Sequence, residues 1–129
     1  MFCSIEALSK EDEYSAGIKK ICDFLIKIGV YPKLKGYNLI ISSVICAVRD
    51  PDCLHSITTI LYPTIAKSYN VSVACVERNV RNAIDTAYNS GKLHEIANTF
   101  YGGNFKKYER PTNGEFISYL ANIVKFSSW

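Results

Sequence analysis

The sequence has few of the residues from which metal and catalytic sites are built. Only two histidines occur, His55 and His94, and no H-x-x-x-H, G-x-S-x-G, paired-carboxylate helix or phosphate-binding glycine loop accompanies them. The cysteines are Cys3, Cys22, Cys46, Cys53 and Cys75. An odd set without a C-x-x-C pair predicts neither a closed disulfide framework nor a zinc site. We therefore expect reduced thiols in a cytoplasm, no metal, no cofactor and no enzymatic activity.

Long apolar runs and a secretion signal are missing as well. Residues 1–13 lack a basic start followed by an apolar run. The longest apolar stretch, Leu39–Val48, is interrupted by Ser42 and Ser43 and is too short to span a bilayer. No segment alternates with period two for long enough to predict a sheet, and there is no internal repeat or low-complexity tract. These absences favour an all-α, cytoplasmic protein without a membrane partner.

What the sequence does contain fits one folded domain. It has 129 residues, of which 48% are hydrophobic and 21% are charged. A chain of this size buries about two-thirds of the surface that its unfolded form exposes, so a real core is expected. The formal net charge of +3 lowers the cost of approaching a polyanion without showing that one is bound. We expect a leader over residues 1–13 and a helical domain over residues 14–129.

Apolar residues at helical spacing predict a compact domain of six to seven helices. The helices are expected over about residues 18–28, 36–48, 62–69, 72–89 and 93–100, with a short one opening at His55 and a last one from Thr112. Gly29 and Gly91 are placed to end two of them, Ser72 caps the longest, and Thr112 and Glu115 have capping-box spacing. The pair at about 62–90 predicts a helix-turn-helix, in a winged-helix-like or response-regulator effector type of fold without a sheet.

The helix over residues 72–89 carries the strongest functional pattern. At about 100° per residue, its apolar side chains fall on one face, while Arg78, Arg81 and Asn82 fall opposite. The short helix before it completes the unit that seats a second helix in the major groove of DNA. A guanidinium donates two hydrogen bonds to guanine and a carboxylate accepts one from cytosine N4. Arg78, Arg81 and Glu77 are therefore the predicted base contacts.

Contacts to the DNA backbone are expected on either side of this helix. The candidates are Ser72, Lys35, Lys67, Asn82 and Lys92. Scattered lysines are also a common form of solvated surface, and many all-α proteins carry Arg and Glu on the wet face of an amphipathic helix. The pattern alone leaves both interpretations open. Cys75, near the start of the helix, is either an ordinary exposed thiol or a redox-sensitive one.

Several motifs together resemble one family, the DNA-binding domain of the stage-zero sporulation regulator A of spore-forming Firmicutes. Around the helix-turn-helix they are Ser56-Ile57-Thr58, Leu61-Tyr62-Pro63, Ile65-Ala66-Lys67, Val76-Glu77-Arg78, Arg81 and Ala83-Ile84. Outside it they are Ile28-Gly29-Val30, Lys35-Gly36-Tyr37 and Pro111-Thr112-Asn113 with Glu115-Phe116. The resemblance runs without insertions from about Lys19 to Phe126, which makes chance similarity improbable.

The resemblance implies a six-helix effector domain that binds elements similar to TGTCGAA, controls entry into sporulation and pairs with a second copy on tandem sites. It also implies that Glu77, Arg78 and Arg81 lie in the recognition helix and face bases. Two positions depart from the family pattern, because Cys75 stands where the family usually has arginine and Asn82 where it has histidine. Losing an outward cation removes about one phosphate contact, which predicts weaker binding or altered site preference.

The family's regulators carry an N-terminal phosphoacceptor receiver, and nothing in this sequence resembles one. The chain is then either a free-standing version or an excised effector fragment. A rival function is a protein-interaction module, which would pair with a full-length regulator through its last helix and modulate it without binding DNA. Retention of Glu77, Arg78 and Arg81 favours DNA binding, whereas Cys75 and Asn82 leave room for the rival.

Overall fold

The computed structural model describes residues 11–93, 95 and 110–127, and the elements within them are all helical. The α-helices are α2 (Glu11–Lys27), α3 (Lys35–Arg49), α4 (Tyr62–Tyr69), α5 (Val73–Asn89) and α7 (Asn113–Ser127). A 3-10 turn (Pro51–His55) and a π-turn (Ile57–Leu61) connect α3 to α4. The expected all-α class without a sheet is confirmed for these residues. Most of the expected helix over 93–100 and most of the expected leader lie outside the described residues. Lys106 and Lys107, two further lysines that the sequence offers for phosphate contacts, lie outside them as well.

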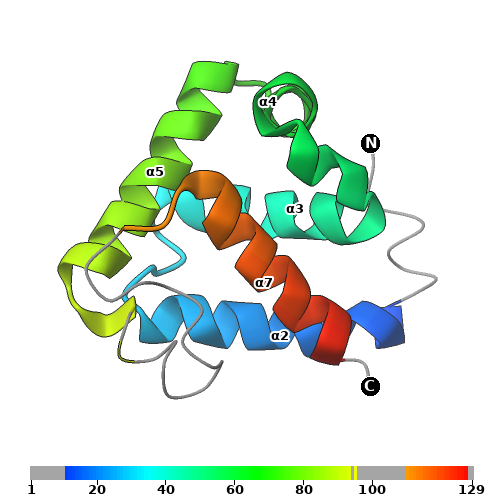
Figure 1. The fold of residues 1–129 in the computed structure, drawn as a ribbon. Helices are drawn as coiled ribbons and strands as arrows, with labels where there is room; N and C mark the ends of the chain where they lie inside the picture. Colours follow the sequence, from blue (N-terminus) through cyan, green and yellow to red (C-terminus); the bar gives the residue numbers. More distant parts are fainter. Residues whose placement is uncertain (1–10, 94, 96–109, 128–129) are drawn as a thin grey trace.

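Helix α3 is the centre of the fold. It contacts α2, α4, α5 and α7, and Figure 1 shows it between α2 and the α4–α5 pair with α7 crossing in front. Its side chains Leu39, Ile40 and Val44 are buried. Burying apolar surface on several sides of one helix supplies most of the driving force for a domain of this size. The helix-turn-helix is therefore built on a rigid core.

The helix-turn-helix has the expected boundaries. Helix α4 ends at Tyr69 and is followed by Asn70, whose backbone is left-handed with a φ of 56°. The amide of Val71 donates to the carbonyl of Ala66 at 3.0 Å. Asparagine tolerates this conformation better than most residues. Ser72 then caps α5, because its Oγ accepts a hydrogen bond from the amide of Cys75 at 3.0 Å. Three residues thus join the two helices, as the sequence predicts.

The segment between α3 and α4 differs from the expectation. A short helix was expected to open at His55, but the 3-10 turn opens at Pro51 and ends at His55. Proline suits the first position of a helix, because its φ is already helical and its missing amide hydrogen has no partner there. Pro63 lies in the first turn of α4 for the same reason, directly after the π-turn. Pro63 therefore marks a change of helix type rather than a gap in the helical path.

Helix α2 begins at Glu11, earlier than the apolar pattern starting at Ile18 indicates. It ends near Gly29, whose φ of 95° and whose neighbour Val30, donating to the carbonyl of Leu25 at 2.8 Å, form the expected C-terminal stop. Helix α7 begins with the expected capping box. The amide of Thr112 donates to the carboxylate of Glu115 at 2.8 Å, and the amide of Glu115 donates to the Thr112 hydroxyl at 3.1 Å.

Four cysteines lie among the described residues, and all four are free thiols: Cys22, Cys46, Cys53 and Cys75. The Sγ atoms of Cys46 and Cys53 are 3.9 Å apart where α3 meets the 3-10 turn. Burial raises the pKa of both thiols, that of Cys53 from 9.0 to about 12. The thiolate forms of both are therefore disfavoured in the folded protein.

The raised thiol pKa values predict a loss of stability at high pH. The unfolded chain gives up these protons at a lower pH than the folded protein, so unfolding releases protons above about pH 9. The free energy of unfolding should then fall as the pH rises from about 9 toward 12. Urea denaturation of the protein and of Cys53→Ala at several pH values checks this. The variant should lose stability with pH less steeply, and equal slopes would contradict the assignment.

Candidate nucleic-acid interface

Helix α5 presents a polar face on a firmly buried base. Its buried residues are Val76, Val80, Ala83, Ile84 and Ala87. Arg78, Arg81 and Asn82 are exposed on the opposite side, as the helical projection predicts. Val73 and Cys75 are half-buried, and the amide group of Asn79 donates to the Cys75 Sγ at 3.2 Å. Cys75 is therefore less open to solvent than an ordinary exposed thiol.

The three predicted base contacts lie within about one turn of α5, but two of them are paired with each other and the third is not. Glu77 and Arg81 form an ion pair at i,i+4 spacing, and their side chains are 39% and 45% exposed. Arg78 is exposed and, within the described part of the chain, makes no hydrogen bond or ion pair. A guanidinium beside a carboxylate offers donors and an acceptor at neighbouring points of the same surface. Arg78 offers donors alone.

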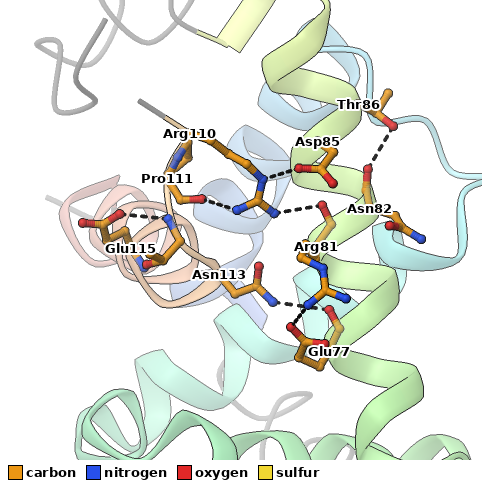
Figure 2. A network of polar contacts seen from close by, with 10 residues as sticks. Glu77, Arg81, Asn82, Asp85, Thr86, Arg110, Pro111, Asn113 and Glu115 are labelled. Carbon is orange, nitrogen blue, oxygen red and sulfur yellow. Dashed lines mark hydrogen bonds and ion pairs between the residues drawn. The ribbon is translucent and has the colours of Figure 1, made fainter. Parts of the chain in front are cut away.

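The segment before α7 is docked on one side of α5. Arg110 forms an ion pair with Asp85, donates from Nη2 to the backbone carbonyl of Arg81 at 3.1 Å, and donates from Nη1 to the carbonyl of Pro111 at 2.9 Å. Figure 2 shows these contacts side by side with the Glu77–Arg81 pair. The side chain of Arg110 therefore joins two elements that are distant in the sequence.

Asn113 ties the start of α7 to both helices of the helix-turn-helix. Its Nδ2 donates to the hydroxyl of Tyr62 in α4 at 2.9 Å. It also donates to the backbone carbonyl of Glu77 in α5 at 3.3 Å (Figure 2). Tyr62 is buried, and burial raises the pKa of its hydroxyl, which keeps it neutral. Both helices are thereby held against α7 close to Glu77.

On its other side, α5 meets the start of α3. A cavity of about 280 Å³ lies between them, lined on the α3 side by Lys33–Gly36 and on the α5 side by Asn79, Asn82, Ala83 and Thr86. The helices approach closely here, because a Cβ atom added to Gly36 would lie 2.8 Å from the Cβ of Ala83. Glycine is needed at this contact for lack of space rather than for its backbone angles.

The predicted backbone-contacting residues divide into three groups. Lys35 and Asn82 line the same cavity, although they come from different helices. Ser72 caps α5, and exposed Lys67 lies in the last turn of α4 before it. Exposed Lys92 follows the end of α5. The structure thus places Ser72 and Lys67 near one end of α5, Lys92 at the other, and Lys35 with Asn82 along its side.

Sequence reasoning missed two features of this surface. Asn79 and Thr86 line the cavity together with Lys33, Lys35 and Asn82, but their spacing in the sequence gave no sign of this. The Asp85–Arg110 pair joins residues 25 positions apart and has no local signal either. The Glu77–Arg81 pair did have one, since i,i+4 spacing brings opposite charges together on a helix.

The described residues include no group of three or more His, Cys, Asp and Glu side chains that could hold a metal ion. His55 is exposed at the end of the 3-10 turn. Among the helices that the structure describes, none is both long and apolar enough to cross a membrane. The features of this surface are exposed cations on α5, neighbouring lysines and a cavity that Lys33 and Lys35 help to line, which suit a polyanionic partner.

A comparison with known families gives a match to "Sporulation initiation factor Spo0A C terminal" over residues 21–124. The chain belongs to this family. The matched residues run from α2 into α7 and include the helix-turn-helix and both segments packed beside α5. The resemblance stated from the sequence motifs is thereby confirmed. As a Spo0A C-terminal domain, the protein is a DNA-binding regulatory domain associated with transcription in sporulation.

Proposed function

We propose that α5 is a recognition helix that lies in the major groove and reads an element similar to TGTCGAA. One observation carries this proposal: Glu77, Arg78 and Arg81 stand on the exposed side of the second helix of a helix-turn-helix that is anchored by α3 and by the segment before α7. A rigidly mounted helix of this kind can hold side chains against base edges.

The chemistry of the three side chains matches this element. Each arginine can donate two hydrogen bonds to the O6 and N7 atoms of guanine, and Glu77 can accept one from cytosine N4. The element offers guanine and cytosine next to each other, in the step CG. The Glu77–Arg81 pair suits such a step, because its carboxylate and guanidinium already lie side by side. Arg78 is the freest of the three to reach another guanine.

The backbone contacts are proposed to surround these base contacts. Lys35 and Asn82 would hold a phosphate at the cavity, Ser72 and Lys67 one near the start of α5, and Lys92 one near its end. Cys75 and Asn82 carry no charge, whereas the family resemblance implies arginine at the first position and histidine at the second. Compared with a relative that has both of those residues, the slope of log affinity against log salt should be shallower by about one unit for each missing phosphate contact.

Ser72 offers a test that separates its two proposed roles. Ser72→Ala removes the cap of α5 and should lower the free energy of unfolding by about 1 kcal/mol. Ser72→Asp keeps a capping oxygen and suits the positive end of the helix, so stability should be retained. Its negative charge should nevertheless weaken DNA binding if a phosphate lies there. Urea denaturation and duplex titration of both variants check this, and full affinity in Ser72→Asp would remove Ser72 from the interface.

We also propose that the domain acts in the cytoplasm and pairs with a second copy on tandem sites. The rival function, pairing with a full-length regulator without contacting DNA, predicts a different set of results. The retained Glu77, Arg78 and Arg81, their exposure and the family membership favour DNA as the direct partner.

The proposal is tested by titrating the purified protein into a fluorescent duplex that contains TGTCGAA and into a scrambled duplex, at several salt concentrations. We expect tighter binding of the first duplex at every salt concentration, with both affinities falling as salt rises. Equal affinity for both duplexes would exclude sequence-specific reading. Binding to neither, together with capture of a full-length regulator, would establish the interaction module instead.

A further inference from the structure

We infer that Arg110 is a positioning residue for DNA binding: it neutralises Asp85 on the DNA-facing side of α5 and fixes the turn that carries Arg81. This inference rests on the proposed function. Asp85 lies four residues after Arg81 and seven after Arg78, so all three share one side of the helix. The Asp85 side chain is 43% exposed, which leaves its charge open to the surroundings.

An unpaired carboxylate at this position would oppose the proposed function. Phosphates of a bound duplex would lie near the exposed side of α5, and like charges repel across the short distances of an interface. Arg78 and Arg81 would attract the duplex while Asp85 repelled it. The domain keeps the carboxylate, so its charge has to be balanced by another group of the protein.

Arg110 has the geometry for this balance. Its Nε bonds the Asp85 carboxylate, Nη2 the carbonyl of Arg81 and Nη1 the carbonyl of Pro111 (Figure 2). All three guanidinium nitrogens are thus engaged, and the side chain is only 27% exposed. A guanidinium held this way is directed at the protein and not toward a ligand. Arg110 therefore acts through Asp85 and Arg81 rather than as a direct contact.

The contact at the Arg81 carbonyl adds a positional role to the electrostatic one. It joins the segment before α7 to the turn of α5 from which the Arg81 side chain projects. Lysine could supply the same charge to Asp85 but has no fork of donors to hold three acceptors at once. Charge and position are therefore separable by substitution.

The test is a set of variants titrated into the TGTCGAA duplex: Arg110→Met, Asp85→Asn, the double variant of both, and Arg110→Lys. Arg110→Met should weaken binding by about tenfold, because a cation is lost and a carboxylate is uncovered. The double variant should regain most of that loss. The affinity of Arg110→Lys for the duplex should lie between that of the unchanged protein and that of Arg110→Met. Asp85→Asn alone should bind at least as tightly as the unchanged protein.

A matched control separates a local effect from one of overall charge. Asp23 is exposed on α2, and Asp23→Asn changes the net charge by the same amount as Asp85→Asn. Combined with Arg110→Met, it should restore no binding. Thermal unfolding of every variant shows whether the fold is kept, since a purely structural Arg110 would alter the unfolding temperature and would not be rescued through Asp85.

Each outcome decides one of the two proposals. If the unchanged protein prefers the element but the double variant binds as weakly as Arg110→Met, Arg110 contacts DNA or serves the fold alone, and this inference fails while the proposed function stands. Equal rescue by Asp23→Asn would overturn it too. If the unchanged protein shows no preference for the element, the proposed function fails and the inference falls with it.

Discussion

Arg78→Ala and Arg81→Ala should each weaken binding to the TGTCGAA duplex by about 1–3 kcal/mol, which is roughly 5- to 150-fold. The scrambled duplex should lose much less affinity, because phosphate attraction remains. Arg81→Ala is expected to have the larger effect. It removes a guanidinium and also leaves the Glu77 carboxylate, now paired with Arg81, without its partner at the DNA surface.

The matched control for this prediction is Lys20→Ala. Lys20 is an exposed cation on α2, so its loss lowers the net charge equally without touching α5. Titration of all three variants into both duplexes gives the comparison. A fall of the same size on both duplexes would mean that the arginines supply charge only, and no fall at all would remove α5 from the interface.

Gly36→Ala should destabilise the protein by about 1–3 kcal/mol, which is typical of an overpacked contact. The new methyl group would overlap the backbone carbonyl oxygen of Asn79 and lie 2.8 Å from the Cβ of Ala83. A helix backbone cannot rotate away as a flexible side chain can, so α3 and α5 would have to separate. The change adds only one methyl group, but it disturbs the contact by which α5 packs against α3.

Gly114→Ala is the control for this substitution. Gly114 lies in the first turn of α7, and the nearest atom to an added Cβ is the Cγ1 of Ile57 at 3.7 Å, an ordinary contact. Alanine there should be neutral or stabilising by about 0.4–1 kcal/mol, because it restricts the unfolded chain. Urea denaturation of the two variants decides the matter, and equal stability would show that the approach of α3 to α5 is looser than the structure indicates.

The sequence predicted those parts of the fold that depend on neighbouring residues. The cap at Ser72, the capping box at Thr112 and Glu115, and the stop at Gly29 all act within a few residues, so their chemistry is visible in the pattern. The exposed and buried sides of α5 followed from helical periodicity alone.

Other parts depend on how distant segments meet, and no local pattern encodes that. The Arg110–Asp85 pair and the hydrogen bonds from Asn113 to Tyr62 and Glu77 exist only because the segment before α7 packs on the helix-turn-helix. The segment from Pro51 to Leu61 was only partly predicted: a short helix was expected to open at His55, whereas the first one opens at Pro51, where proline is tolerated in a first helical turn.

The central claim, that arginines of α5 read guanine in the major groove, is tested most directly by changing the DNA. Single guanines of the TGTCGAA duplex are replaced in turn by 7-deazaguanine, which lacks the N7 acceptor in the major groove and keeps the minor-groove edge. The protein should bind at least one such duplex several-fold more weakly, and the loss should disappear in Arg78→Ala or Arg81→Ala, whichever contacts that guanine. Unchanged affinity for every substituted duplex would contradict the account.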